Sequence, residues 1–195
     1  MAKLWFGGSF NPIHHAHLIA ARAVAEARGY EKVVLVPSFQ PPHKLLERDI
    51  APAEDRLVMC RLAVAESNLF EVDDLELRRG GPSFTIDTVR ELKRRGNAEV
   101  HWLIGADMVN ILPQWHEPAA LMAEATVVVM ARPGWECDWE RLPAEYQTLK
   151  AREAPLPPVQ MSATEIRNRV RRGLGIEYLT PEGVVRYIRE KALYR

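Results

Sequence analysis

Short apolar runs alternate along the chain with segments whose apolar positions recur every three or four residues. Leu4–Phe6 and Val33–Val36 are runs of the first kind, and they end at Gly7 and Pro37 as buried strands do. Between them, apolar side chains recur at helical spacing from Leu18 until the next glycine. This order of strand, helix and strand is the basic unit of an α/β fold.

The same alternation continues through the second half of the chain. Helical spacing predicts helices over 53–66 and over 86–95, and strands are predicted at Val100–Ile104, Val127–Met130 and Val159–Met161. Strands that are apolar on both faces belong in a parallel sheet covered by helices on both sides. We therefore expect a doubly wound, Rossmann-like α/β fold, with the functional site where strand carboxyl ends meet helix amino ends.

The organisation expected is a single domain, residues 1–195, because this length suffices for one hydrophobic core. Thr180 and Pro181 are a typical N-cap and first-turn pair, so a last helix should follow them. We expect the C-terminal helical part, about 162–195, to pack on the sheet.

Composition and charge disfavour several classes of protein. Hydrophobic residues make up 47% and charged residues 27%, which is typical of globular proteins, and Lys plus Arg equals Asp plus Glu at 26 each. Without a net field, neither nucleic acid nor an anionic membrane is an expected partner. The longest apolar run, 125–131, is far shorter than the roughly 20 residues of a membrane helix. Lone Cys60 and Cys137 and the absence of a signal-like start predict a cytoplasmic protein. A homo-oligomer is left open.

The most informative segment joins the first strand to the first helix, and reads Gly-Gly-Ser-Phe-Asn-Pro-Ile-His-His-Ala-His over 7–17. Glycines let the backbone approach a ligand, and the free amides of a helix N-terminus suit a phosphate. His14 and His17 share one face of the first turn and can donate hydrogen bonds to phosphate oxygens. A tight turn with surface histidines would fit the same pattern. A zinc site is disfavoured, because no carboxylate or cysteine lies near in sequence.

A second candidate anion site follows the predicted strand 159–161. Ser162 and Glu165 have the spacing of a capping box, which would by itself explain both residues. Thr164 and Arg167 add a hydroxyl and a guanidinium at the same helix N-terminus, a combination that binds anions.

Together the two segments resemble the signatures of the nucleotidyltransferase superfamily with the histidine-containing, HxGH-type motif. The first signature usually ends in His-x-Gly-His, and the second usually reads Ile-Ser-Ser-Thr-x-x-Arg. Here Ala16 and Ala163 occupy a glycine and a serine position, and Asn11 stands where aspartate is commoner.

Further segments resemble bacterial nicotinate mononucleotide adenylyltransferases over nearly the whole chain. They are Pro41–Lys44, Ser83–Thr88, Ile104–Asp107 with the later Trp115, and Ala131–Gly134. The resemblance implies two sets of binding residues. For ATP they are Gly7, Gly8, Ser9, Phe10, His14, His17, Gly105, Asp107, Arg132, Ser162, Thr164 and Arg167, and for the acceptor Ser9, Lys44, Phe84, Thr85, Asp107 and Trp115.

The activity that the resemblance implies is transfer of AMP from ATP to nicotinate mononucleotide, which gives nicotinate adenine dinucleotide and pyrophosphate in NAD biosynthesis. Such chemistry depends on positioning and charge neutralisation, and the expected catalytic residues are His14, His17 and Arg167. Mg²⁺ is the expected cofactor, held mainly by ATP phosphates, and no metal site built from protein residues is expected. The alternatives are nicotinamide mononucleotide or phosphopantetheine as the acceptor, and a non-catalytic nucleotide-binding regulator.

Overall fold

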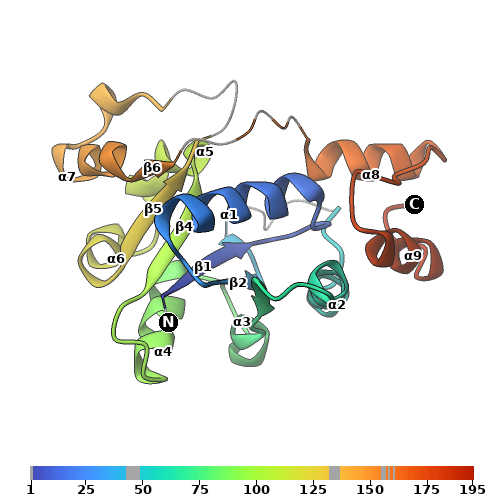
Figure 1. Cartoon of the computed structure of the whole chain (residues 1–195), viewed down its shortest axis with the longest axis horizontal. Coiled ribbons are helices and arrows are strands. Elements are labelled where there is room, and N and C mark those ends of the chain that lie inside the picture. Colours follow the sequence, from blue (N-terminus) through green and yellow to red (C-terminus); the bar gives the residue numbers. More distant parts are fainter. Residues whose placement is uncertain (1, 43–48, 132–136, 155–156, 158, 160) are drawn as a thin grey trace.

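The computed structural model describes residues 2–42, 49–131, 137–154, 157, 159 and 161–195. Within these residues the strands form one parallel sheet of order β3-β2-β1-β4-β5-β6 (Figure 1). The strands are β1 (Lys3–Gly8), β2 (Lys32–Pro37), β3 (Phe70–Val72), β4 (His101–Gly105), β5 (Thr126–Met130) and β6 (Glu153–Ala154). The predicted doubly wound, Rossmann-like α/β fold is therefore confirmed.

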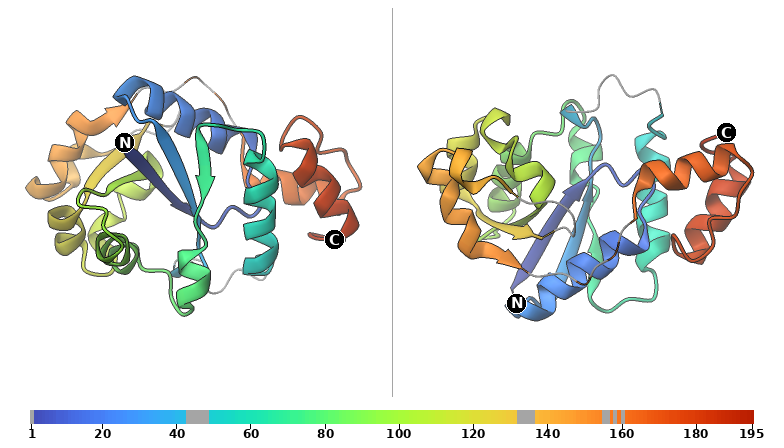
Figure 2. Two further views of the ribbon diagram at one scale, coloured as in Figure 1. Left: turned by 60° about the horizontal axis from the view of Figure 1, so that its bottom comes forward. Right: turned by 90° about the horizontal axis from the view of Figure 1, so that it is seen from above.

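Helices follow the strands and cover both faces of the sheet. They are α1 (His15–Arg28), α2 (Ala53–Val64), α3 (Leu75–Arg79), α4 (Thr85–Arg94), α5 (Ala106–Val109), α6 (Pro118–Glu124), α7 (Ala144–Gln147), α8 (Ala163–Arg171) and α9 (Glu182–Glu190). Short 3₁₀ segments are η2 (Leu112–Gln114), η3 (Trp139–Arg141) and η4 (Thr148–Arg152). In both views of Figure 2, α8 and α9 lie beside α2 at one end of the molecule.

Two hydrophobic clusters lie on opposite faces of the sheet, because alternate residues of each strand point to opposite sides. Leu4 and Phe6 of β1 belong to the cluster that includes buried residues of α1, α2, α8 and α9. Trp5 and its register partner Trp102 belong to the other cluster, which includes buried residues of α3, α4 and α6. The sheet is thus buried on both faces, as its apolar strands predicted.

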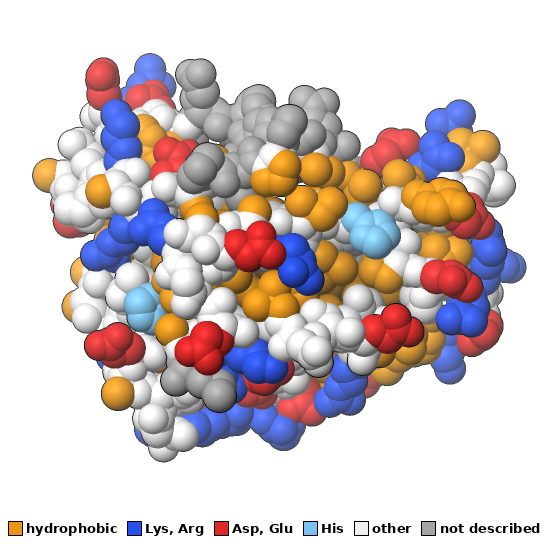
Figure 3. Space-filling model, viewed as in Figure 1, with side chains coloured by type: hydrophobic (Ala, Val, Ile, Leu, Met, Phe, Trp, Pro, Cys, Tyr) orange, Lys and Arg blue, Asp and Glu red, His pale blue; other side chains and the backbone are white. Residues whose placement is uncertain are grey.

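Surface charge is mixed on the face shown in Figure 3. Acidic and basic side chains are interspersed around a central hydrophobic area. Among the described helices, none is long and apolar enough to cross a membrane.

Several sequence-based boundaries need correction. Val159 and Met161 are not in a strand, and the last strand lies earlier, at Glu153–Ala154, where it pairs with β5. Thr180 does not cap α9, because its hydroxyl donates instead to the carbonyl of Ile13 at 2.7 Å and Pro181 takes the N-cap position. Cys60 is a fully buried core residue, as expected.

Candidate active site

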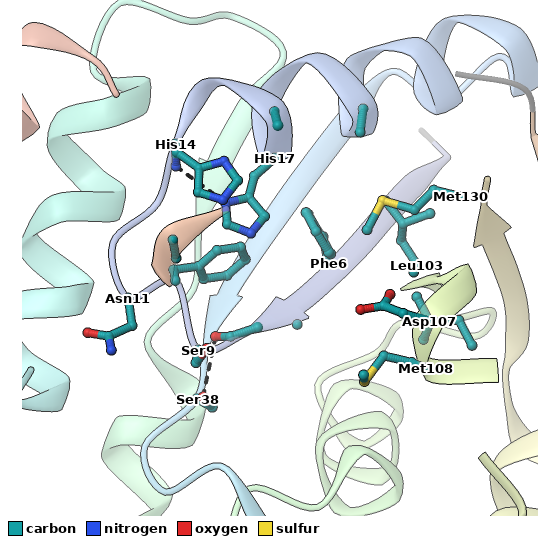
Figure 4. A pocket seen from close by; sticks show the side chains of 18 of the residues that line it. Phe6, Ser9, Asn11, His14, His17, Ser38, Leu103, Asp107, Met108 and Met130 are labelled. Carbon is teal, nitrogen blue, oxygen red and sulfur yellow. Dashed lines mark hydrogen bonds between the residues drawn. The ribbon is translucent and has the colours of Figure 1, made fainter. Parts of the chain in front are cut away.

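A cavity of about 640 Å³ opens at the carboxyl ends of β1 and β4. These neighbouring strands mark the point where the order of the sheet reverses, which is where open α/β sheets bind ligands. Most of the predicted site residues line this cavity: Gly7, Gly8, Ser9, Phe10, His14, His17, Thr85, Gly105, Asp107, Trp115, Ser162, Thr164 and Arg167. Figure 4 shows His14 and His17 on one side of the cavity and Asp107 on the other.

The two predicted histidines form one unit at the start of α1. His14 is the N-cap residue and is only 4% exposed, and its ring stacks on that of His17 with 3.7 Å between centroids. The backbone N–H of His14 donates to Nδ1 of His17 at 3.3 Å, the bond drawn in Figure 4. Because Nδ1 accepts, this hydrogen bond assigns the ring proton of His17 to Nε2, which can donate to a ligand oxygen.

Aromatic packing fixes the orientation of the His17 ring. Phe10 meets it edge to face at 5.3 Å between centroids, and Phe6 meets Phe10 in the same way at 5.3 Å. Phe10 is buried and has a left-handed backbone, with φ of 44°, an uncommon conformation for a residue other than glycine. The bend at Phe10 lets its ring return under the helix start, where it supports the histidine.

The glycines that end β1 are required by neighbouring side chains. A β-carbon at Gly7 would overlap Cζ2 of Trp102, and one at Gly8 would lie 3.1 Å from the Phe10 ring. Both residues line the cavity. Small residues here therefore leave room for aromatic side chains as well as for a ligand.

The second predicted anion site, at the start of α8, supplies side chains to the same cavity from far along the chain. Ser162 caps α8, and its Oγ accepts the Glu165 N–H at 3.2 Å. Arg167 is 5% exposed; one terminal nitrogen donates to the Asn11 carbonyl at 3.0 Å and the other to Thr164 Oγ1 at 3.4 Å. Its buried Nε has no hydrogen-bond partner among the described residues. An unpaired buried donor of this kind is costly unless a ligand accepts from it.

The opposite side of the cavity carries the residues predicted for the sugar and the ring. Asp107 lies in the first turn of α5, and a β-carbon on the preceding Gly105 would overlap its Oδ1. Trp115 follows η2 and is partly buried. Phe84 does not line the cavity; it precedes α4 and stacks on His116, with 4.3 Å between ring centroids.

Two predicted site residues, Lys44 and Arg132, lie outside the described residues.

Arg56 of α2 is a structural residue of the site that the sequence reasoning missed. It is 1% exposed and donates to the carbonyls of Ser9, Phe39 and Ala51 at 2.7, 3.0 and 2.9 Å. Burial lowers the pKa of its guanidinium from the usual value. The available signal was its spacing, three residues after Ala53 and four before Cys60, which places it on the buried face of the helix.

A buried carboxylate, Glu76, was also missed. It lines the cavity and is 3% exposed, and burial raises its pKa. Its carboxylate accepts from Thr88 Oγ1 at 2.5 Å and from the Ser83 hydroxyl. Ser83 Oγ in turn accepts the N–H groups of Phe39 and Gln40 at 2.9 and 3.3 Å. This network joins the segment after β2 to the segment before α4.

Comparison with known proteins gives a family match and several similar relatives. The cytidylyltransferase-like family matches residues 5–169. The chain is 42% identical to a probable nicotinate-nucleotide adenylyltransferase of Geobacillus kaustophilus, over 97% of this chain and 84% of the relative. It is 39% identical to one of Thermomicrobium roseum, over 97% and 90%.

The fold is also that of a solved structure. The Plasmodium falciparum nicotinic acid mononucleotide adenylyltransferase complexed with NaAD superposes with a TM-score of 0.78 at 17% identity, covering 100% of this chain and 98% of that one. At this identity the likeness concerns the fold alone. From the family match and the close relatives, the chain belongs to the cytidylyltransferase-like family and, within it, groups with the probable nicotinate-nucleotide adenylyltransferases.

Proposed function

We propose that the chain is a nicotinate-nucleotide adenylyltransferase, which transfers AMP from ATP to nicotinate mononucleotide and releases pyrophosphate. The observation that carries the proposal is the joining, in one cavity, of His17 from α1 and Arg167 from α8. His17 offers Nε2–H and Arg167 offers an unpaired, buried Nε–H. Two such donors, each from the N-terminal half of its own helix, suit a triphosphate, and the relatives' names supply the acceptor.

The proposed reaction is an in-line displacement at the α-phosphorus of ATP. An oxygen of the acceptor's 5′-phosphate forms the new P–O bond as the bond to the pyrophosphate oxygen breaks, so no protein nucleophile is needed. His14, His17 and Arg167 hold phosphate oxygens while negative charge moves to the leaving pyrophosphate. The other ATP ligands proposed are the 7–10 segment, Gly105, Asp107, Arg132, Ser162 and Thr164.

The proposed acceptor site lies on the opposite side of the cavity. Ser9 and Lys44 bind the acceptor phosphate, Asp107 accepts from ribose hydroxyls, and Trp115 contacts the pyridine ring with Thr85 beside it. Phe84 does not line the cavity and is not proposed to contact the acceptor. Thr85 begins α4 and lines the cavity. Because first-turn amides have no acceptor within their own helix, this end favours an acidic over an amide ring substituent.

Mg²⁺ is the proposed cofactor, and the donor set of the cavity fits an ion that arrives with ATP. Among the described residues, no three or more His, Cys, Asp or Glu side chains are grouped so that they could hold a metal. Two carboxylates among the described residues line the cavity, Glu76 and Asp107, and Glu76 accepts from Thr88. The ion would be held by phosphate oxygens and water, and when bound it neutralises phosphate charge.

The test is pyrophosphate release from ATP and Mg²⁺ with either nicotinate mononucleotide or nicotinamide mononucleotide. We expect turnover with the acid and a kcat/KM at least tenfold lower with the amide. Equal or better use of the amide would reject the acceptor assignment. No release with either compound, together with tight ATP binding, would favour a nucleotide-binding regulator.

A further inference from the structure

The segment after α9 returns to the loop that begins the active site. The phenolic hydroxyl of Tyr194 donates to Oδ1 of Asn11 at 2.8 Å, across 183 positions of sequence. Tyr194 is partly buried against the core, and burial raises its pKa, so the hydroxyl remains a donor at neutral pH.

Asn11 connects Tyr194 to two other segments. Its Oδ1 also accepts the N–H of Ala51 at 3.0 Å, and its Nδ2 donates to the carbonyl of Asp49 at 2.8 Å. These partners fix the orientation of the amide, because a backbone N–H must face its oxygen. Asp49 is held a second time, through its carboxylate, by Arg171 of α8 at 2.5 Å.

The backbone around Asn11 forms part of the cavity wall. Asn11 is 2% exposed and lines the cavity with Ser9 and Phe10. Its carbonyl accepts from Arg167, the residue proposed to bind phosphate. The amide side chain of Asn11 and its carbonyl therefore tie together the loop before α1, the segment 49–51 and α8.

We propose that Tyr194 is a positioning residue of this active site: by holding Asn11, it fixes the loop 9–11 relative to the segment 49–51 and to Arg167. The inference rests on the proposed function for its kinetic consequence. Tyr194 does not touch the reacting atoms. It raises the fraction of molecules whose loop is already in the binding geometry, and apparent affinity scales with that fraction.

Loss of the Tyr194 hydroxyl should therefore weaken binding more than chemistry. Loss of one net hydrogen bond to a buried partner shifts the equilibrium constant between the ordered and the displaced loop by about three- to tenfold. We expect Tyr194→Phe to raise KM for ATP by about three- to tenfold, with kcat changed by less than about twofold, because bound ATP selects the ordered loop.

The matched control is Tyr178→Phe. Tyr178 has the same backbone φ of 64° as Tyr194 but is 93% exposed. Steady-state kinetics and thermal unfolding are measured for both variants. A Tyr194→Phe variant with the kcat and KM of Tyr178→Phe overturns the proposal. So does a loss of kcat at unchanged KM in proportion to the unfolded fraction, which is what a purely structural role would give.

A double-mutant cycle with Asn11→Ala tests the route. If Tyr194 acts through Asn11, Tyr194→Phe should change kcat/KM by less than about twofold in the Asn11→Ala background. The full three- to tenfold effect in that background would overturn the proposal. Asn11→Asp is used if Asn11→Ala does not fold. Aspartate keeps an oxygen that can accept the hydrogen bond of Tyr194, so in that background the full effect is expected. Its absence would contradict the proposal that Tyr194 acts through residue 11.

Calorimetric titration with ATP distinguishes a failure of the proposed function from a failure of the positioning role of Tyr194. If wild-type protein binds ATP but does not turn over, the same variants are compared by their dissociation constants. A three- to tenfold weaker ATP binding by Tyr194→Phe alone supports the positioning role even then, and unchanged binding rejects it.

Discussion

Gly7→Ala is the change that best tests the account of the active-site backbone. A β-carbon at Gly7 would overlap Cζ2 of Trp102 and lie 3.0 Å from its Cη2. Trp102 is 2% exposed and belongs to the core cluster on one face of the sheet, so its ring has little freedom to move away. The clash is between one methyl group and the six-membered ring of the indole.

The expected magnitude follows from two opposing effects. Overpacking of a filled core costs about 1–3 kcal/mol, whereas replacing glycine by alanine in a compatible backbone stabilises by about 0.4–1 kcal/mol through the unfolded state. We expect Gly7→Ala to lower the free energy of unfolding by about 1–2 kcal/mol. For a chain of this size that corresponds to a fall in Tm of about 2–8 °C.

The assay is thermal and urea unfolding of Gly7→Ala in the wild-type and Trp102→Phe backgrounds. Phenylalanine lacks the ring atoms that the new methyl group would meet, so in that background the change should cost about 1 kcal/mol less. An equal cost in both backgrounds, or no loss of stability at all, would refute the packing explanation. Weakened ATP binding at unchanged stability would instead assign Gly7 to close approach of the nucleotide.

Three further predictions concern the site and its surroundings. Gly105→Ala should leave the free energy of unfolding nearly unchanged, because the atom that the new methyl group meets is the far end of the flexible Asp107 side chain. It should raise KM for the substrates about tenfold, because Asp107 must move. Unchanged KM in steady-state assays would contradict a role of Asp107 in binding. His17→Gln should lower kcat by about 10²-fold or more. The start of α1 should stay intact, because glutamine at this position can still accept the N–H of the N-cap residue. Wild-type turnover would contradict the phosphate-binding role of His17. Burial and the hydrogen bond to Asp55 raise the pKa of Tyr187 to about 12, so the protonated phenol stabilises the fold below about pH 10 and this contribution is lost as pH rises toward 12. Ultraviolet titration should show one tyrosine ionising near pH 12 that Tyr187→Phe lacks, and identical titrations would contradict the assignment.

Local sequence patterns were sufficient to predict the longer helices and strands. The apolar runs at β1 and β2 and the helical spacing of α1 and α2 predicted these elements to within a few residues. The short strands were not predicted, because β3, with 3 residues, and β6, with 2, are too short to show a pattern. The segment 159–161 has a better strand pattern than Glu153–Ala154, but it is the earlier segment that pairs with the edge of β5. Such pairing is decided by tertiary structure.

The candidate site shows the same division between local and distant causes. The histidines at the start of α1 and the hydroxyl and arginine at the start of α8 carry their own local signals, namely helix N-termini with anion-binding side chains. Nothing local relates Tyr194 to Asn11, because their contact spans 183 positions. Likewise, Phe84 follows the pattern of a site residue, yet it stacks on His116 beside the cavity rather than lining it.

The loop before α1 explains why buried polar residues were the hardest to predict. Its carbonyls belong to no sheet ladder and still need donors. Arg56, Arg167 and Thr180 supply them, to Ser9, Asn11 and Ile13. By sequence alone, an arginine in a helix is assigned to the solvent face, although here two are almost fully buried.

These two guanidiniums also bear on the proposed binding of a triphosphate by a chain of zero net charge. Arg56 and Arg167 place two positive charges against carbonyls of the loop, in a buried region where a charge acts more strongly than at the surface. Of the two, Arg167 lines the cavity, whereas Arg56 contacts the loop from outside the cavity lining, so in the proposed function it would act through its field and through the loop that it holds. The proposed anion site therefore depends on where a few charges are buried, and the overall balance of acidic and basic residues does not argue against it.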